Sequence, residues 1–331
     1  MHHQKTVTTY RKSWVAALTT LLLSSALPGH AADTTLVIGD QARIMRSLME
    51  SAGVLHNLPY QIRWANFQGA APLFEAQRAD AVDTSFAGDL PVLQALAGGV
   101  RLTILLTDVA TGKGNGIVVP ADSPIHSISD LKGQQVVVSS AAGSISQNLL
   151  YLALAKAGID RQATRIRFVL PTDASAAFNS GQIKAWAVFD PYLAVAQQNG
   201  ARLLTDASHL TASFSFLSAT TASLSDPHKR QAIRDFAERV RQARQWAIDH
   251  PALYASSYAQ LSHLPLKTAQ LITSRGPTAS RPVTDADLNT LQQTADRFYG
   301  YGILPAKITV RQFADPHFLT QSVSQPATTS P

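Results

Sequence analysis

The chain contains no cysteine among its 331 residues, which excludes disulfides, thiolate metal sites and cysteine nucleophiles. Its ten histidines show no zinc-type spacing, so we expect no metal site and no cofactor. Charged residues are only 15% of the chain, and beyond the local Arg239-Val240-Arg241 we find no run of basic residues or basic helix stripe of the kind that binds nucleic acid. The glycine-containing corner at 143–146 lacks the lysine of a nucleotide-binding P-loop, so we expect no nucleotide there.

Acidic residues are also absent from the first 32 positions. Three basic residues there precede an apolar run over 13–27, and a Pro-Gly pair follows it. The run is too short to span a bilayer comfortably, and small residues stand at both cleavage-determining positions. We expect residues 1–32 to be a signal peptide cut after Ala31 or Ala32, with an N-terminal anchor helix as the alternative. Cleavage leaves 25 basic and 22 acidic residues, a net charge of +3.

The rest of the chain alternates short apolar strands with helical segments, which is typical of a wound α/β sheet. In one segment an apolar strand runs through Gly88 into Asp89 and Pro91, and the same pattern recurs 101 residues later at Asp190 and Pro191. Each copy predicts a strand that leads into a helix, with Asp as N-cap and Pro in the first turn. Helix N-termini attract anions, so two such corners facing each other predict an anion-binding cleft.

The repeat predicts two similar lobes. We expect residues 33–115 to form the first part of lobe 1, 116–214 to form lobe 2, and 215–320 to form a second, helical part of lobe 1. The Ser/Thr/Pro-rich residues 321–331 are expected to be a disordered tail.

A second candidate anion site lies at Gly143-Ser144-Ile145-Ser146, where a glycine, two hydroxyls and a helix N-terminus converge. Gly88 would let a ligand approach bare backbone, unless it is a simple turn glycine. Asp89 and Asp190 are either helix caps alone or caps that also touch ligand.

Four longer side chains are further candidates. Gln41 follows a strand end, and its side-chain amide would donate a hydrogen bond to a ligand oxygen. Arg43 and Arg275 either donate charge-assisted, two-pronged hydrogen bonds to the ligand or are ordinary surface arginines. Trp186 stands four residues before Asp190 and is either a core side chain or an aromatic wall for an organic group.

Taken together, these motifs resemble the periplasmic solute-binding proteins for aliphatic sulfonates, with their taurine and nitrate relatives. The similarity covers roughly residues 34–312, and the order and spacing of the motifs are more specific than any one of them. The matching stretches are Ile38–Gln41, Phe86–Pro91, Ile117–Ile125, Ile128–Gln134, Ala185–Tyr192, Arg281–Asp285 and Phe298–Pro305.

The resemblance implies a type II periplasmic-binding-protein fold, in which two α/β lobes close on a ligand in the cleft between them. It also implies delivery of the ligand to an ABC permease in the inner membrane. Carried over by position, the cleft residues are Gln41, Gly88, Asp89, Ser144, Trp186, Asp190 and Arg275. Where relatives often show Gly-Tyr-Gln-Lys, this chain has Gly39-Asp40-Gln41-Ala42, which favours taurine or another organic sulfonate over a bare inorganic anion.

We therefore expect a monomeric, non-catalytic periplasmic receptor for an alkanesulfonate or taurine, serving sulfur acquisition. The 88–89 and 143–146 corners would hold the sulfonate head, and Trp186 would flank the tail. One alternative is a nitrate, other small-anion or aromatic-acid binding protein of the same fold. Another is a related enzyme, although the resemblance implies that desulfinases need a cysteine and pyrimidine-synthesis proteins a histidine-rich site. A third is a ligand-sensing module for a membrane kinase.

Overall fold

The structure is a computed structural model that describes residues 34–210, 213–275 and 279–320. The predicted signal peptide and the predicted tail lie outside the described residues. Within the part of the chain that is described, no helix is both long and apolar enough to cross a membrane.

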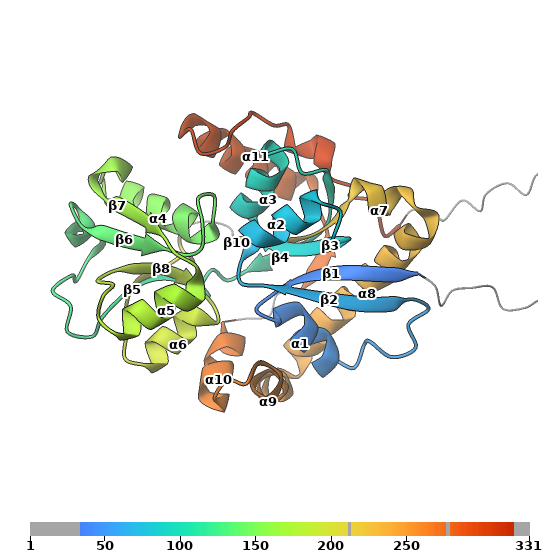
Figure 1. Cartoon of the computed structure of the whole chain (residues 1–331), viewed down its shortest axis with the longest axis horizontal. Coiled ribbons are helices and arrows are strands. Elements are labelled where there is room, and N and C mark those ends of the chain that lie inside the picture. Colours follow the sequence, from blue (N-terminus) through green and yellow to red (C-terminus); the bar gives the residue numbers. More distant parts are fainter. Residues whose placement is uncertain (1–33, 211–212, 276–278, 321–331) are drawn as a thin grey trace, which may run out of the picture. The chain divides into compact units, whose positions relative to one another are not determined.

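Two mixed β-sheets organise the chain (Figure 1). The six-stranded sheet, in the order β11-β4-β10-β3-β1-β2, defines lobe 1, and the five-stranded sheet, in the order β7-β6-β8-β5-β9, defines lobe 2. The strands of lobe 1 are β1 (Thr35–Gln41), β2 (Gln61–Phe67), β3 (Thr84–Gly88), β4 (Leu102–Ala110), β10 (Ser213–Thr220) and β11 (Ser280–Pro282). The strands of lobe 2 are β5 (Asn115–Val119), β6 (Gln135–Val138), β7 (Arg165–Phe168), β8 (Trp186–Phe189) and β9 (Arg202–Asp206).

Both lobes follow one plan of strand pairing. In lobe 1, β1 pairs in parallel with β2 and β3, and β10 runs antiparallel between β3 and β4. In lobe 2, β6 pairs in parallel with β7 and β8, and β5 runs antiparallel between β8 and β9. The strands β3 and β8 thus take equivalent places, and each leads into one of the two Asp-Pro corners. The predicted fold class, with two similar α/β lobes, is confirmed.

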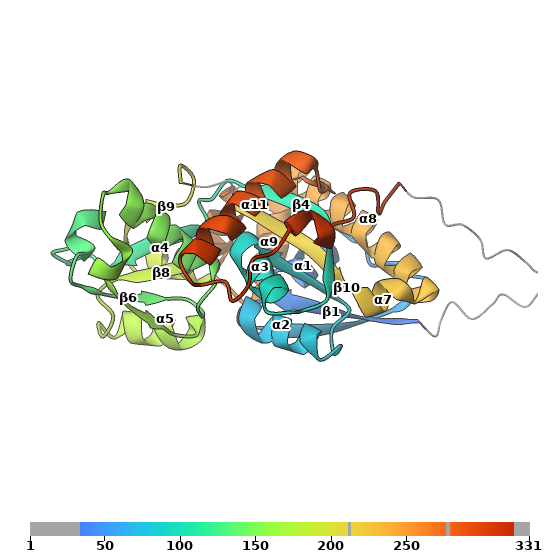
Figure 2. The ribbon, with the colours of Figure 1, turned by 90° about the horizontal axis from the view of Figure 1, so that it is seen from above.

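Helices cover both faces of each sheet, and inner strands such as β5 and β8 are accordingly apolar and buried on both sides. In lobe 1, α2, α3 and α11 pack on one face, and α1, α8 and α9 on the other (Figure 1). In lobe 2, α4 packs on one face and α5 and α6 on the other, and Figure 2 shows α4 and α5 on opposite sides of the sheet. The helices of lobe 1 are α1 (Ile44–Ser51), α2 (Ala70–Arg78), α3 (Asp89–Ala97), α7 (Thr221–Ser225), α8 (Pro227–Asp249), α9 (Pro251–Ser262), α10 (Leu266–Ser274) and α11 (Asp285–Gly300). Those of lobe 2 are α4 (Ile145–Lys156), α5 (Pro171–Asn179) and α6 (Tyr192–Gln198).

The chain crosses between the lobes twice, from β4 to β5 and from β9 to β10. Gly112 in the first crossing has φ +80°, and a Cβ on it would stand 2.7 Å from the backbone of Ala207 and Ser208 in the second. The Ala207 N–H also donates to the Gly112 carbonyl at 3.3 Å. The two crossings therefore lie against each other. The residue-level limits of the domains stay a prediction.

Candidate functional site

A cavity of ≈ 310 Å³ lies between the two lobes. Lobe 1 contributes the corners after β1 and β3, and lobe 2 contributes the start of α4 and the corner after β8. Ligands of wound α/β sheets bind at the carboxyl ends of the strands, which is where these corners meet. Among the predicted site residues, those that line the cavity are Gln41, Gly88, Asp89, Ser144, Asp190 and Arg275.

The corners carry three buried aspartates, Asp40 after β1, Asp89 after β3 and Asp190 after β8. Burial raises the pKa of each carboxyl from its ordinary value to about 6, because removal from water disfavours the charged form. At neutral pH most of each group is still ionised. The cavity therefore has carboxylates of its own at the corners where the sequence predicts a ligand anion.

These carboxylates occupy backbone donors of the helices that follow them. Asp40 accepts the N–H groups of Met45 at 3.0 Å and Arg46 at 2.9 Å, and Asp190 accepts that of Ala194 at 3.0 Å. Asp190 thus accepts a donor of the first turn of α6, but the N-cap position of that helix is occupied by Pro191, so the predicted N-cap is wrong there. The prediction is also wrong for Asp89, because Gly88 occupies the N-cap position of α3 and Asp89 is the first residue of the helix.

Gln41 and Arg275 are both engaged within the protein. The Gln41 amide donates to the Phe86 carbonyl at 2.8 Å. The Arg275 guanidinium pairs with Asp190 at 2.5 Å and donates to the Gln197 side chain. Arg275 follows α10 of lobe 1, while Asp190 and Gln197 belong to lobe 2. The Arg275 side chain therefore links the two lobes.

Arg244 in α8 was not predicted as a site residue, yet it lines the cavity. Its Nε lies 2.7 Å from an Asp108 oxygen, and these side chains are only 11% and 3% exposed. Neither Nε nor the Asp108 oxygens are aligned for a hydrogen bond, so the contact is Coulombic. The guanidinium carbon lies 5.0 Å from the centroid of the Phe86 ring, at cation–π distance.

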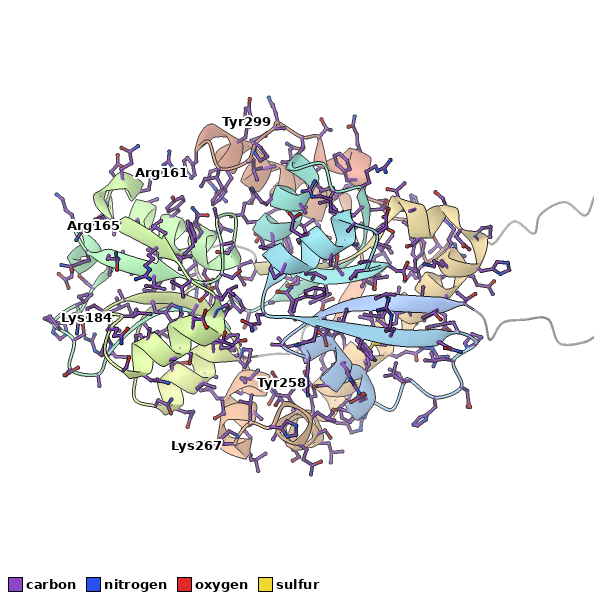
Figure 3. All side chains as sticks on the ribbon, in the orientation of Figure 1. Arg161, Arg165, Lys184, Tyr258, Lys267 and Tyr299 are labelled. Atoms are coloured by element: carbon purple, nitrogen blue, oxygen red, sulfur yellow. The ribbon has the colours of Figure 1, made fainter. Side chains whose placement is uncertain are left out.

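The terminal nitrogens of Arg244 form no hydrogen bond with a described residue, in contrast to those of Arg275. Arg244 and Arg275 are the basic residues of the described chain that line the cavity. Arg165 and Lys184 lie instead at the outer edge of lobe 2, on the side away from lobe 1 (Figure 3). A signal for Arg244 exists in the sequence: it follows Ala237 and Val240 at helical spacing, so it stands within the apolar stripe of α8.

Tyr254 in α9 also lines the cavity, and its hydroxyl makes no hydrogen bond within the described part of the chain. Burial raises the pKa of this hydroxyl, and the charge of Arg244 partly offsets the rise. Tyr254 is therefore a protonated donor at neutral pH beside the arginine.

The 143–146 corner has a smaller part in the main cavity than predicted. The Gly143 N–H donates to the Gln147 side chain at 2.7 Å, and Ser146 is fully buried with its hydroxyl 3.4 Å from Asn115. Neither lines the main cavity, although Gly143 lines a second one of ≈ 230 Å³ beside it. Ser144 lines both cavities and accepts the Gln147 N–H as the N-cap of α4.

Trp186 does not line the cavity, so the structure corrects its predicted role as an aromatic wall. It is fully buried, it packs at 5.4 Å on the ring of Phe178, and its indole N–H donates to Ser139 at 2.9 Å. Along β8 the side chains alternate, and the face that Trp186 shares with Val188 is covered by α5 and α6. Arg43, the other arginine considered as a fork, is exposed and lies outside the cavity lining.

No group of three or more His, Asp or Glu side chains among the described residues could hold a metal ion. The polar groups that face the cavity are thus two arginines, three aspartates, and a set of hydroxyls and amides. Such a lining can bind an organic anion and orient its substituents.

Comparisons with known proteins agree with this geometry. The family model NMT1/THI5 like matches residues 69–253. A "Putative aliphatic sulfonates-binding protein" from Escherichia coli (strain K12) is 32% identical over 256 residues, covering 76% of this chain and 78% of the relative.

Solved structures show the same similarity. The alkanesulfonate-binding protein SsuA from Xanthomonas axonopodis pv. citri, bound to MOPS, superposes with a TM-score of 0.79 at 28% identity, over 86% of this chain and 99% of that one. The periplasmic aliphatic sulphonate binding protein SsuA from Escherichia coli gives 0.74 at 30% identity, over 88% and 100%.

A desulfurization enzyme, DSZB, shares the fold alone, with a TM-score of 0.65 at 17% identity over 86% and 97% of the two chains. The family model spans more than half of the chain, and the relatives above 25% identity are binding proteins. The chain belongs to the NMT1/THI5-like family, among the solute-binding proteins related to the aliphatic sulfonate-binding proteins, as its motifs predict.

Proposed function

We propose that the protein is a non-catalytic periplasmic receptor that binds an organic sulfonate in the main cavity and delivers it to an ABC permease. The observation that carries the proposal is Arg244, a largely buried arginine whose terminal nitrogens make no hydrogen bond with a described residue and which lines a mostly apolar cavity. A planar guanidinium donates two parallel hydrogen bonds to an oxyanion, and a sulfonate presents three such oxygens.

The sulfonate head would bind at Arg244, with the Tyr254 hydroxyl as a further donor. Asp108 on one side and the Phe86 ring on another hold the guanidinium in place, so little side-chain entropy is lost when the ligand arrives. This position replaces the 88–89 and 143–146 corners as the proposed head site, because those corners carry a carboxylate or have their donors engaged.

The organic part of the ligand would occupy the rest of the cavity. The cavity has a volume of ≈ 310 Å³. Nitrate or sulfate alone would leave most of that space unfilled. The walls include Phe86, Phe214, Ile145 and Ile272, which offer apolar contact to an alkyl or aryl tail.

Binding without catalysis is supported by the chemistry of the chain. The fold also serves a desulfurization enzyme, but this sequence has no cysteine to act as nucleophile. The predicted signal peptide and the relatives named as sulfonate-binding proteins support a periplasmic location and a transport role. Transport requires a permease that accepts the closed protein, and growth on the ligand as sole sulfur source, lost on deletion of that permease, would separate transport from sensing.

The test is a thermal-melt panel on the chain without residues 1–32. The ligands are ethane-, propane- and octane-1-sulfonate, taurine, benzenesulfonate, nitrate and sulfate. A ligand at a hundred times its dissociation constant adds about 2.7 kcal/mol to the free energy of unfolding, which is several degrees in Tm. We expect a shift with at least one organosulfonate and none with nitrate or sulfate. A shift with the inorganic anions alone, or with no ligand, would contradict the proposal.

A further inference from the structure

The guanidinium of Arg275, a residue of lobe 1, is held by two side chains of lobe 2. One terminal nitrogen pairs with the Asp190 carboxylate at 2.5 Å, and the other donates to the Gln197 side chain. The side chains of Arg275 and Asp190 are only 10% and 13% exposed, so solvent ions screen their attraction little. Arg275 directly follows α10, which lies against α6 of lobe 2 (Figure 1). The contact therefore joins the lobes through one charged fork.

Both ends of this ion pair are also tied to the first crossing between the lobes, residues 111–114. The Thr111 hydroxyl donates to the Arg275 carbonyl, and the Asp190 N–H donates to the Gly114 carbonyl at 2.8 Å. A Cβ on Gly114 would stand 3.1 Å from an Asp190 oxygen, so the carboxylate packs closely on the crossing. Two-lobed proteins that close on a ligand bend at the segments that join their lobes. The ion pair thus lies where a change in the angle between the lobes would act on it.

A second contact between the lobes has a different chemistry. Tyr151 of α4 stacks on Phe298 of α11 with the ring centroids 6.2 Å apart, and it meets the edge of Tyr301 at 6.0 Å. Figure 1 shows α11 and α10 at opposite ends of the lobe boundary. Aromatic pairs accept stacked and edge-on arrangements alike, whereas a guanidinium fork needs both acceptors in one geometry. The Arg275 contact is therefore the more sensitive of the two to the angle between the lobes.

Gln197 indicates that the fork serves the lobes rather than the ligand, because it does not line the main cavity. We propose that Arg275, Asp190 and Gln197 form a lobe lock, which stabilises the closed cleft and slows release of the ligand through contacts between the lobes. This inference rests on the proposed function, since the ligand whose release is slowed is the sulfonate. The lock separates the two cavity arginines by role: Arg244 binds the ligand, and Arg275 holds the lobes together around it.

Gln197→Ala tests the lock at a position outside the cavity lining, and alanine suits its place in α6. Release of propane-1-sulfonate is followed by stopped-flow fluorescence of Trp246, whose ring lies 6.3 Å from that of the cavity-lining Tyr254. We expect release about tenfold faster than from the wild type, the effect of one hydrogen bond to a charged group, with no slower association. Gln198→Ala is the matched control, because Gln198 is an exposed neighbour on the same helix and lies outside the cavity lining. It should release the ligand at the wild-type rate.

Asp190→Asn tests the sign of the effect. Removal of a carboxylate from the cavity lining would by charge alone hold an anion more firmly, whereas loss of the lock's ion pair should release it faster. Asparagine keeps an acceptor for the Ala194 N–H, so the start of α6 is preserved. We expect release to be several-fold faster than from the wild type. Slower release would overturn the lock.

Two further outcomes would also decide the question. Wild-type release from Gln197→Ala, together with fast release from Arg275→Gln, would make Arg275 a donor to the ligand and overturn the lock. If the wild type binds no sulfonate, the proposed function fails, and X-ray scattering of the ligand-free proteins tests the lock alone. Arg275→Gln should then have a larger radius of gyration than the wild type, and equal radii would overturn the lock.

Discussion

Arg244→Gln is the substitution that tests the proposed head site most directly. It removes the charge and the guanidinium fork while keeping a polar side chain of similar reach. It also leaves Asp108, 3% exposed, without its counter-ion. Loss of one partner of a buried ion pair costs about 3–5 kcal/mol of stability. Arg244→Gln combined with Asp108→Asn removes both charges and should recover most of that loss.

The single and double variants together separate the effect of Arg244 on ligand affinity from its effect on the stability of the fold. Each charge-assisted hydrogen bond to the sulfonate contributes about 1.5–3 kcal/mol, so loss of the two-bond fork should weaken binding by at least about a hundredfold. The double variant should lose as much sulfonate affinity as the single variant, because removing the Asp108 charge restores stability but restores no N–H donor to the ligand. Calorimetric titration with propane-1-sulfonate measures affinity, and urea unfolding of the ligand-free protein measures stability.

Arg241→Gln is the control on the same helix. Arg241 pairs with Glu238, is 38% exposed and lies outside the cavity, so its replacement changes net charge equally without touching the site. It should bind propane-1-sulfonate like the wild type. A folded double variant that also binds with wild-type affinity would refute Arg244 as the sulfonate anchor.

Three further substitutions have defined outcomes. Trp186→Phe should lower the free energy of unfolding by about 1–3 kcal/mol, since Ser139 loses its buried donor, yet leave sulfonate affinity within about twofold in titration. A large loss of affinity would mean that Trp186 contributes to ligand binding. Gly88→Ala places a Cβ 2.4 Å from the Ile145 side chain of the opposite lobe, so closure should cost about 1–2 kcal/mol and affinity should fall several-fold; unchanged affinity would mean that Ile145 moves aside. The pKa of Asp89 is about 6 in the folded protein against about 3.9 unfolded, so its stabilising contribution is complete below about pH 3.9 and is lost as pH rises through 6. Ligand-free Asp89→Asn should therefore gain stability relative to wild type between pH 4 and 7.5, by up to about 3 kcal/mol in urea unfolding, and a pH-independent difference would contradict the raised pKa.

Much of the fold follows from local signals in the sequence. The two strand-to-helix corners could be predicted because their signals act over a few positions, and their repetition indicated two lobes, although neither aspartate is the N-cap residue itself. Gln41 and Gly88 at strand ends, and Ser144 at the start of the helix after β6, were placed at the cavity because the carboxyl ends of neighbouring strands converge.

The rest depends on contacts between distant segments. β8 is a run of apolar residues with both faces covered, so no polar alternation indicated which face Trp186 would take. Asp190 and Arg275 are 85 residues apart, and no local pattern shows that they pair across the lobes. The charge at the corners was also misjudged. Helix N-termini favour anions in general, but here carboxylates of the chain itself already occupy the helix N–H donors.

The position of β10 has a consequence for the order of folding. β10 pairs with both β3 and β4, so these two strands of lobe 1 become neighbours through a segment that is made after all of lobe 2. The strands of lobe 2 lie together between Asn115 and Asp206, so that sheet can form as soon as its own segment is complete. A chain that ends before residue 213 has a gap in the centre of its first sheet, with the edges of β3 and β4 unpaired. The lobe at the N-terminal end is thus the one that is finished last.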